Sequence, residues 1–384
     1  MRKVTRPVAE LLAIRLLLVV LIALVAGPKA RQGKGLGVDT ARYQQIATST
    51  GTPYRDFDAE YPPLAYFELK AVHGSTAQQT ASHLAWAQLA LDAVTAIAIL
   101  LVWGEAAVVA YLVFTMVFVP LIYLELEPLV LALSVVALAL IEKGRDRAGG
   151  VLLAAAAFAK VWPVLLLPLL AARAKWRALR YSAVAGLIGL GAWVAWAGLG
   201  APLAVLRFRG LDGWTTGSTG GVVLRIFNHP PIRYVGDMNR VGTLAPWVSP
   251  GLFIVVVAVA AWAAWASRQN GRWPVAALLS VAATLLLSPI FSYQYVIWLV
   301  PFAAISGERR LQVLTFVAVA ISAAMLAWVS VAAAGGPLLE WSELVKILAV
   351  LAVAVEAARS LVSSRIPAIR PAPEVSSARQ GVSR

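Results

Sequence analysis

The densest group of residues able to do chemistry lies between positions 38 and 66, directly after the first apolar run of the chain. This stretch reads V-D-T-A-R-Y-Q-Q-I-A-T-S-T-G-T-P-Y-R-D-F-D-A-E-Y-P-P-L-A-Y. Carboxylates can act as general bases, and tyrosines can contact a ligand or anchor a loop at a membrane surface. We therefore expect catalysis or recognition here, against the plainer interpretation of a solvated loop. The carboxylates are Asp39, Asp56, Asp58 and Glu60.

The composition predicts a membrane protein that crosses the bilayer several times. The 384 residues are 60% hydrophobic and 14% charged, whereas about a quarter of the residues in a soluble domain are charged. With no cysteine and three scattered histidines (His73, His83 and His229), we expect no disulfide and no metal site. The net charge of +14 comes mostly from short loops and the chain ends, which indicates membrane orientation and not nucleic-acid binding.

The elements that must position these residues are expected to be about twelve transmembrane helices in one domain, residues 1–361. Basic residues near the N-terminus place both termini in the cytoplasm by the positive-inside rule. Two larger loops, at about 28–80 and 200–249, then lie outside, and within the first a surface helix follows Asp39 at its expected N-cap. The tail, residues 362–384, is rich in Pro, Ser and Arg and is expected to be disordered and cytoplasmic.

The segment 148–172 has basic flanks on both sides, which a single crossing would place on opposite faces of the membrane. We predict instead a hairpin of two short helices, with Lys160-Val161-Trp162-Pro163 at its tip, inside the protein and lining a cavity. A single crossing, with Lys160 as a lysine that reaches toward the interface, is the alternative.

Charges in two other places need an explanation. The loop 200–249 holds five arginines, Arg207 and Arg209 among them, against two aspartates, although outer loops usually carry few basic residues. Guanidinium groups suit a phosphate, with anionic lipid headgroups as the alternative. Asp92 falls within an apolar run, where an acid is either functional or part of a bond between helices.

Three stretches together resemble glycosyltransferase family 87, whose members are polyprenol-phosphate-mannose-dependent mannosyltransferases of the GT-C type. The first is the Asp39 segment followed by G-x-P-Y-x-D-F-x-x-E-Y-P-P. The others are A-K-V-W-P-V-L-L-L-P at 159–168 and S-P-I-F-S-Y-Q-Y-V-I-W-L-V-P at 288–301, with a weaker match in R-F-R-G-L-D-G-W-T-T-G-S at 207–218.

The resemblance implies an all-α, GT-C-like membrane bundle that transfers a hexose from a polyprenyl phosphate to a glycolipid or glycan outside the cell. Asp39 is the implied base, with Asp58 as the alternative, and inversion would follow from a single displacement. No cofactor or metal is implied if Lys160, Arg207 and Arg209 neutralise the phosphate. The residues expected to contact sugar or acceptor are Tyr54, Glu60, Tyr61, Tyr293, Gln294 and Tyr295.

Two other classes of function remain open at this point. A lipid transporter or flippase without covalent chemistry would need paired charges on several central helices, of which the sequence offers chiefly Asp92 and Lys160. A noncatalytic assembly protein could keep the same fold. The choice between mannose, arabinose or another sugar, the acceptor and the oligomeric state are not predicted. The Ala, Val and Arg content fits a GC-rich bacterial genome. We expect the protein to lie in the bacterial plasma membrane, in contact with membrane lipids.

Overall fold

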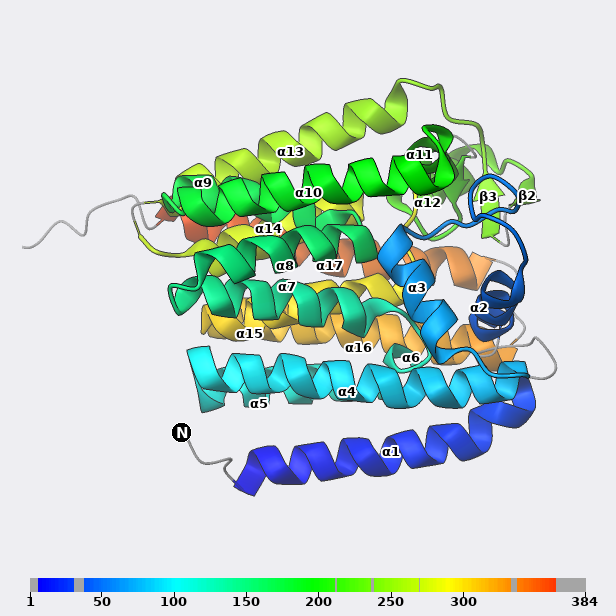
Figure 1. Cartoon of the computed structure of the whole chain (residues 1–384), viewed down its shortest axis with the longest axis horizontal. Coiled ribbons are helices and arrows are strands. Elements are labelled where there is room, and N and C mark those ends of the chain that lie inside the picture. Colours follow the sequence, from blue (N-terminus) through cyan, green and yellow to red (C-terminus); the bar gives the residue numbers. More distant parts are fainter. Residues whose placement is uncertain are drawn as a thin grey trace, which may run out of the picture.

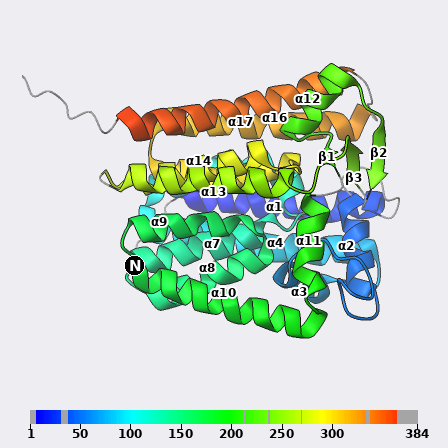
Figure 2. The same ribbon diagram turned by 90° about the horizontal axis from the view of Figure 1, so that it is seen from above.

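The computed structural model describes residues 6–30, 38–210, 213–235, 238–268, 270–332 and 337–363. Its helices run side by side, alternately in opposite directions, and form an elongated bundle (Figure 1). The short helices α2, α3, α11 and α12 and all described strands gather at one end, which we call the loop end (Figures 1 and 2). The turn between α7 and α8 lies at the opposite end (Figure 1).

The first part of the chain builds one side of the bundle. Gly104, with a φ of 94°, separates α4 from α5, and Pro63 begins α3 at a position where a helix needs no backbone donor. The helices are α1 (Arg6–Ala30), α2 (Val38–Thr48), α3 (Pro63–Val72), α4 (Ala77–Trp103), α5 (Glu105–Met116), α6 (Val119–Ile122), α7 (Glu127–Glu142) and α8 (Asp146–Ala159).

The rest of the chain contains two short 3-10 helices, η2 and η3, each followed directly by an α-helix. A proline near the start of η2 and of α15 favours this change of helix type, because proline cannot donate a backbone hydrogen bond. The elements are η2 (Trp162–Leu166), α9 (Leu167–Ala172), α10 (Trp176–Ala197), α11 (Gly200–Gly210), α12 (Thr219–Asn228), α13 (Val248–Ser267), α14 (Trp273–Leu287), η3 (Tyr293–Leu299), α15 (Val300–Ser306), α16 (Arg309–Ala332) and α17 (Pro337–Ser363).

Within the described residues, four helices are long and apolar enough to cross a membrane. They are Ala77–Trp103, Trp176–Ala197, Val248–Ser267 and Arg309–Ala327. The expected membrane bundle is therefore present, but the expected number of about twelve crossing helices is not confirmed. Several apolar runs form helices of 10–17 residues, which at ~1.5 Å per residue fall short of ~30 Å of hydrocarbon.

Three of these shorter runs take part in two hairpins, the first of which pairs α8 with Trp162–Ala172. Lys175 after α9 lies 4.0 Å from Asp146 at the start of α8, so the chain enters and leaves this segment at the same end. The predicted hairpin is thus confirmed, with Lys160 at its tip. A second hairpin, α14 followed by η3 and α15, closes in the same way, because Arg272 lies 3.6 Å from Glu308.

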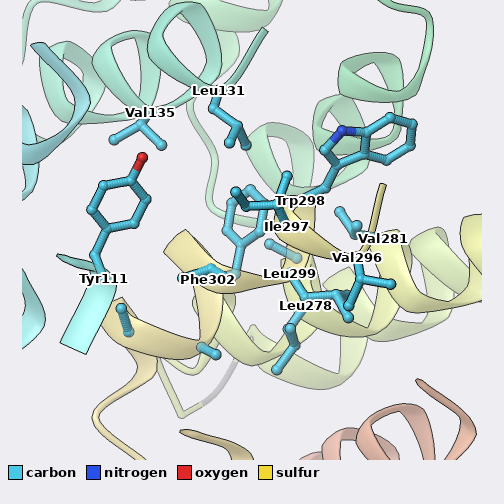
Figure 3. Packing of buried hydrophobic residues seen from close by; sticks show 14 of the residues in the cluster. Tyr111, Leu131, Val135, Leu278, Val281, Val296, Ile297, Trp298, Leu299 and Phe302 are labelled. Atoms are coloured by element: carbon cyan, nitrogen blue, oxygen red, sulfur yellow. The ribbon is translucent and has the colours of Figure 1, made fainter. Parts of the chain in front are cut away.

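The second hairpin runs through the middle of the bundle. Val296, Ile297 and Leu299 of η3 are buried against Leu278 and Val281 of α14 (Figure 3). In lipid such contacts stabilise the fold through close packing of side chains more than through the hydrophobic effect, because lipid tails are themselves apolar. The tip of this hairpin is therefore held rigidly at the loop end.

The loop 200–249 adds a small sheet to a fold that is otherwise helical, as predicted. It holds a three-stranded antiparallel sheet of β1 (Trp214–Thr215), β3 (Met238–Val241) and β2 (Ile232–Val235), in that order. Arg240 in the central strand pairs with Arg233 on one side and with Thr215 on the other. Strands this short carry little periodic signal in a sequence.

Candidate active site

Lys160 stands at the break between α8 and η2, where its extended backbone (φ −157°, ψ 143°) ends the helix. The break places a lysine inside the protein instead of on a helix face exposed to lipid, and only 4% of its surface is exposed. Its ammonium forms an ion pair with Glu127 at the start of α7, which is also buried. A buried charge needs such a partner, because desolvation of an isolated ion is expensive.

Aromatic rings from the second hairpin complete the surroundings of Lys160. The ammonium lies 4.3 Å from the ring centre of Tyr295 and 5.1 Å from that of Trp298. Tyr295 and Trp298 stack on each other at 4.5 Å, and Trp298 stacks on Trp162 at 5.5 Å. The tips of the two hairpins thus meet in one cation–aromatic stack, which fixes the position of the charge.

An apolar cavity of about 870 Å³ begins at this stack. Lys160, Tyr295 and Trp298 lie at one part of its wall, and most of the remaining lining is aliphatic. The other walls come from α11, the start of α13 and the end of α14, including Leu203, Phe253 and Leu285. An apolar pocket with Lys160 among its described lining residues suits an amphiphile with an anionic head.

A pair of carboxyl groups forms the second part of the site. Asp39 lies in the first turn of α2 and is exposed, and its side chain shares a hydrogen bond with Glu125, which is buried. Tyr43 donates a hydrogen bond of 2.6 Å to Glu125 Oε2. Burial, followed by the charges of Asp39 and Glu127, raises the pKa of Glu125 well above its usual range. The buried Glu125 carboxyl therefore keeps its proton to a higher pH than an ordinary glutamate.

Tyr61 joins the two parts of the site. Its ring packs edge-on against Tyr43 at 5.9 Å. Burial, then the charges of Glu60 and Asp39, raise the pKa of the Tyr61 hydroxyl, and Tyr295 and Glu125 have smaller effects in the same direction. Tyr61 thus lies within electrostatic range of both the Asp39–Glu125 pair and the ring beneath Lys160.

Glu68 on α3 is a further buried acid, within electrostatic range of Glu127 and Lys160. Its Oε1 accepts a hydrogen bond of 2.9 Å from Gln88, and its Oε2 is buried with no partner among the described residues. Burial, with a smaller contribution from the charge of Glu127, raises the pKa of Glu68 to about 8, although the hydrogen bond from Gln88 and the charge of Lys160 oppose the shift. Glu68 is therefore neutral at pH 7, which leaves Lys160 with one ionised partner.

The structure brings together four of the residues predicted from sequence: Asp39, Tyr61, Lys160 and Tyr295. Asp58 is exposed and makes no hydrogen bond or ion pair with any described residue. The side chains of Arg207 and Arg209 lie outside the described ones, so their predicted phosphate contact stays a prediction.

The other predicted residues maintain the local fold. Glu60 is paired with Arg42 at 2.7 Å, and Gln294 accepts a hydrogen bond from Ser292. Tyr54 packs on Trp193 at 5.4 Å and donates a hydrogen bond of 2.5 Å to the Tyr61 carbonyl. The Tyr293 hydroxyl bonds Glu343, which is also paired with Lys346 at 2.7 Å. Glu343 and Lys346 lie on α17. The predicted sugar contacts of Tyr54, Glu60, Tyr293 and Gln294 stay predictions.

Three acids of the site were missed from the sequence: Glu68, Glu125 and Glu127. The available signal was E-L-E-P at 125–128, where two acids end an apolar run. As for metals, no three His, Asp or Glu side chains within the described ranges are placed to hold an ion. The predicted independence from metal stays a prediction.

The family model of glycosyltransferase family 87 matches residues 60–289, which is more than half of the chain. The chain belongs to glycosyltransferase family 87. The match includes Glu68, Glu125, Glu127, Lys160 and most of the cavity wall, and it begins after Asp39. No curated protein matches the chain.

Membership of family 87 shows that the protein is a glycosyltransferase with a membrane bundle. Glycosyl transfer needs a base near the acceptor hydroxyl, positive charge near the leaving group and a place for the donor. In this family 87 protein the Asp39–Glu125 pair, Lys160 and the apolar cavity are the groups available for these tasks.

Proposed function

We propose that this glycosyltransferase moves a hexose, with mannose as the first candidate, from a polyprenyl phosphate to a glycolipid or glycan acceptor. The observation that carries the proposal is the apolar cavity of about 870 Å³ with the Lys160 ammonium in its wall. A polyprenyl chain would occupy the apolar part, and its phosphate would lie near Lys160. A water-soluble nucleotide sugar would gain nothing from such a lining.

The chemical step is a single displacement at the anomeric carbon. The acceptor oxygen attacks this carbon while Asp39 takes the hydroxyl proton, and the bond to the phosphate oxygen breaks to release polyprenyl phosphate. Attack opposite the leaving group inverts the anomeric configuration. Asp39 lies beside Glu125, whose raised pKa favours the protonated form of the Glu125 carboxyl.

Lys160 stabilises the charge that develops on the leaving phosphate. Tyr295 and Trp298 fix the ammonium in advance, so that little reorganisation is needed during the reaction. Location in a bacterial plasma membrane, with the loop end facing outward, places the reaction where a lipid-linked donor is available. Both termini would then lie in the cytoplasm.

Turnover in proteoliposomes tests this proposal. The wild type, supplied with a polyprenyl-phosphate hexose and a crude lipid extract as acceptor, should release polyprenyl phosphate. Ala204→Trp, which fills the cavity wall, should lose most of this activity, whereas Ala183→Trp, on the exposed face of α10, should keep it. If the wild type bound the donor but never consumed it, the result would favour a lipid transporter instead. Equal activity of the two variants would show that the cavity does not hold the donor.

A further inference from the structure

A buried centre of charge lies inside the bundle, away from the groups assigned to catalysis. Arg15 of α1 and Asp92 of α4 form an ion pair, and their side chains are 0% and 1% exposed. The sequence left open whether Asp92 is functional or part of a bond between helices, and the structure shows the bond. A buried ion pair adds little net stability in itself, because desolvation offsets the attraction between the charges. We therefore ask which neighbouring groups this pair holds in place.

Two further segments contribute to this centre, α5 and the residues that follow α6. On α5, the Leu112 carbonyl accepts a hydrogen bond of 2.6 Å from Arg15, and Tyr111 donates one of 2.6 Å to Asp92. Tyr123, beyond α6, accepts a bond of 3.1 Å from Arg15 and donates one of 2.7 Å to Asp92. Two tyrosine hydroxyls therefore make the same kind of bond to one carboxylate.

The two tyrosines differ in where they lie along the chain. Tyr111 belongs to the regular helix α5, whereas Tyr123 begins the irregular connector 123–126 between α6 and α7. This connector is buried throughout, and it leads directly to the carboxyl groups of the site. Glu125 follows Tyr123 by two residues and Glu127 by four.

The connector is held by side chains on both sides of Glu125. Leu124 belongs to the main core of the bundle, and Leu126 packs in the smaller core formed with α2 and α3. Irregular buried backbone lacks the regular hydrogen bonds that fix a helix, so side-chain bonds must fix its position. The Tyr123 hydroxyl supplies two such bonds next to the acid.

We propose that Tyr123 is a positioning residue, whose hydroxyl, held by Arg15 and Asp92, sets the place of Glu125 relative to Asp39 during transfer. The inference rests on the proposed function, because it assigns Tyr123 an effect on the Asp39–Glu125 pair. It gives the intramembrane charges Arg15 and Asp92 a role in the reaction although they touch none of the reacting groups.

The groups that face Glu125 would respond to a shift of the connector. They are Asp39 and Tyr43 of α2, Glu127 of α7, and Tyr61 of the segment that follows α2. A change in the distance between Asp39 and Glu125 alters how firmly the shared proton stays on Glu125. A misplacement of ~1 Å at a reacting group can lower a rate about a hundredfold.

The test compares Tyr123→Phe with Tyr111→Phe. Each variant removes one hydroxyl bond to Asp92 from a buried ring, and Tyr123→Phe also removes the bond from Arg15, so both should lower Tm, Tyr123→Phe by more. Only Tyr123→Phe should lower kcat, by about tenfold or more, and shift its pH profile. A second readout does not depend on turnover: the infrared absorption of the protonated Glu125 carboxyl, identified by its loss in Glu125→Gln, should titrate at a different pH in Tyr123→Phe alone.

The outcomes separate this inference from the proposed function. Suppose that the wild type shows no turnover but the infrared titration differs between the two variants. This result would overturn the proposed function and still support the positioning role of Tyr123. Normal wild-type turnover with identical kcat, pH profile and infrared titration in the two variants would overturn the positioning role. Equal loss of kcat in both variants would show that the centre acts only through stability.

Discussion

Glu68 carries a proton at neutral pH, and this proton sets the charge balance around Lys160. Its pKa of about 8 means that the neutral form is present below that pH and is lost above it. Ionised Glu68 would add a second carboxylate near the Glu127–Lys160 pair and oppose the binding of a phosphate. We expect KM for the lipid donor to rise between about pH 7 and about pH 9 in the wild type.

Glu68→Gln isolates this effect, because glutamine is neutral throughout the range and can still bond Gln88. Its KM for the donor should stay flat where that of the wild type rises. Glu10→Gln, at an exposed glutamate on α1, serves as the control and should follow the wild type. A rise of the same size in Glu68→Gln would assign the titration to another group.

A separate prediction concerns the contribution of the Glu127–Lys160 ion pair to stability. Removing one partner of a buried pair leaves an uncompensated charge, so Glu127→Leu and Lys160→Met should each lower stability by ~3–5 kcal/mol. The double variant should be more stable than either single one, as measured by thermal unfolding in detergent. Losses that simply add in the double variant would show that the two charges do not depend on each other.

At the scale of single residues, the sequence predicted some site groups and missed others for a physical reason. Asp39 and Lys160 stand in distinctive stretches, D-x-x-x-Y and A-K-V-W-P, and both lie in the site. Glu125 and Glu68 come from other parts of the chain and acquire their raised pKa values only through burial in the fold. Spacing along the chain holds no information about such burial.

At the scale of elements, the close approach of α8 and α10 supports the first hairpin. A Cβ added to Gly150 of α8 would lie 2.4 Å from the Ala178 carbonyl oxygen of α10, so the two backbones pack through the glycine. Gly150→Ala should push the helices apart and lower stability by ~1–3 kcal/mol. Gly186→Ala on α10 meets no atom within 4 Å and should be neutral or stabilising.

Thermal unfolding of the two glycine variants, with donor KM as a second readout, checks this packing. The hairpin tip carries Lys160, so Gly150→Ala should also raise KM for the donor. Equal unfolding temperatures for the two variants would contradict the close approach of α8 and α10.

The two hairpins show what patterns of charge and hydropathy in the sequence can predict and what they cannot. Basic residues on both flanks predicted the hairpin 148–172, because the positive-inside rule disfavours a single crossing. The second hairpin, α14 with η3 and α15, was expected as two separate crossing helices, because its apolar runs resemble transmembrane segments in composition. Helix length in the structure, and not apolarity, distinguishes a helix long enough to cross the membrane from a shorter helix of a hairpin.

At the scale of the whole molecule, the chain contains no cysteine, so single cysteines can report which face each end occupies. Thr50 at the loop end and Arg145 at the opposite end are both exposed. In intact cells, Thr50→Cys should react with a membrane-impermeant maleimide, and Arg145→Cys should react only after permeabilisation. The reverse pattern would place the Asp39 site in the cytoplasm.

The comparison of Asp39→Asn with Asp58→Asn tests whether Asp39 is the base of a transfer from a lipid-linked donor. Asp39→Asn and Asp58→Asn remove the same charge from exposed aspartates in one region, so proteoliposome turnover compares equal chemistry at two positions. We expect Asp39→Asn to bind donor still and to lose ~10²–10⁴-fold in kcat, while Asp58→Asn stays close to wild type. Loss in Asp58→Asn with activity retained in Asp39→Asn would contradict it.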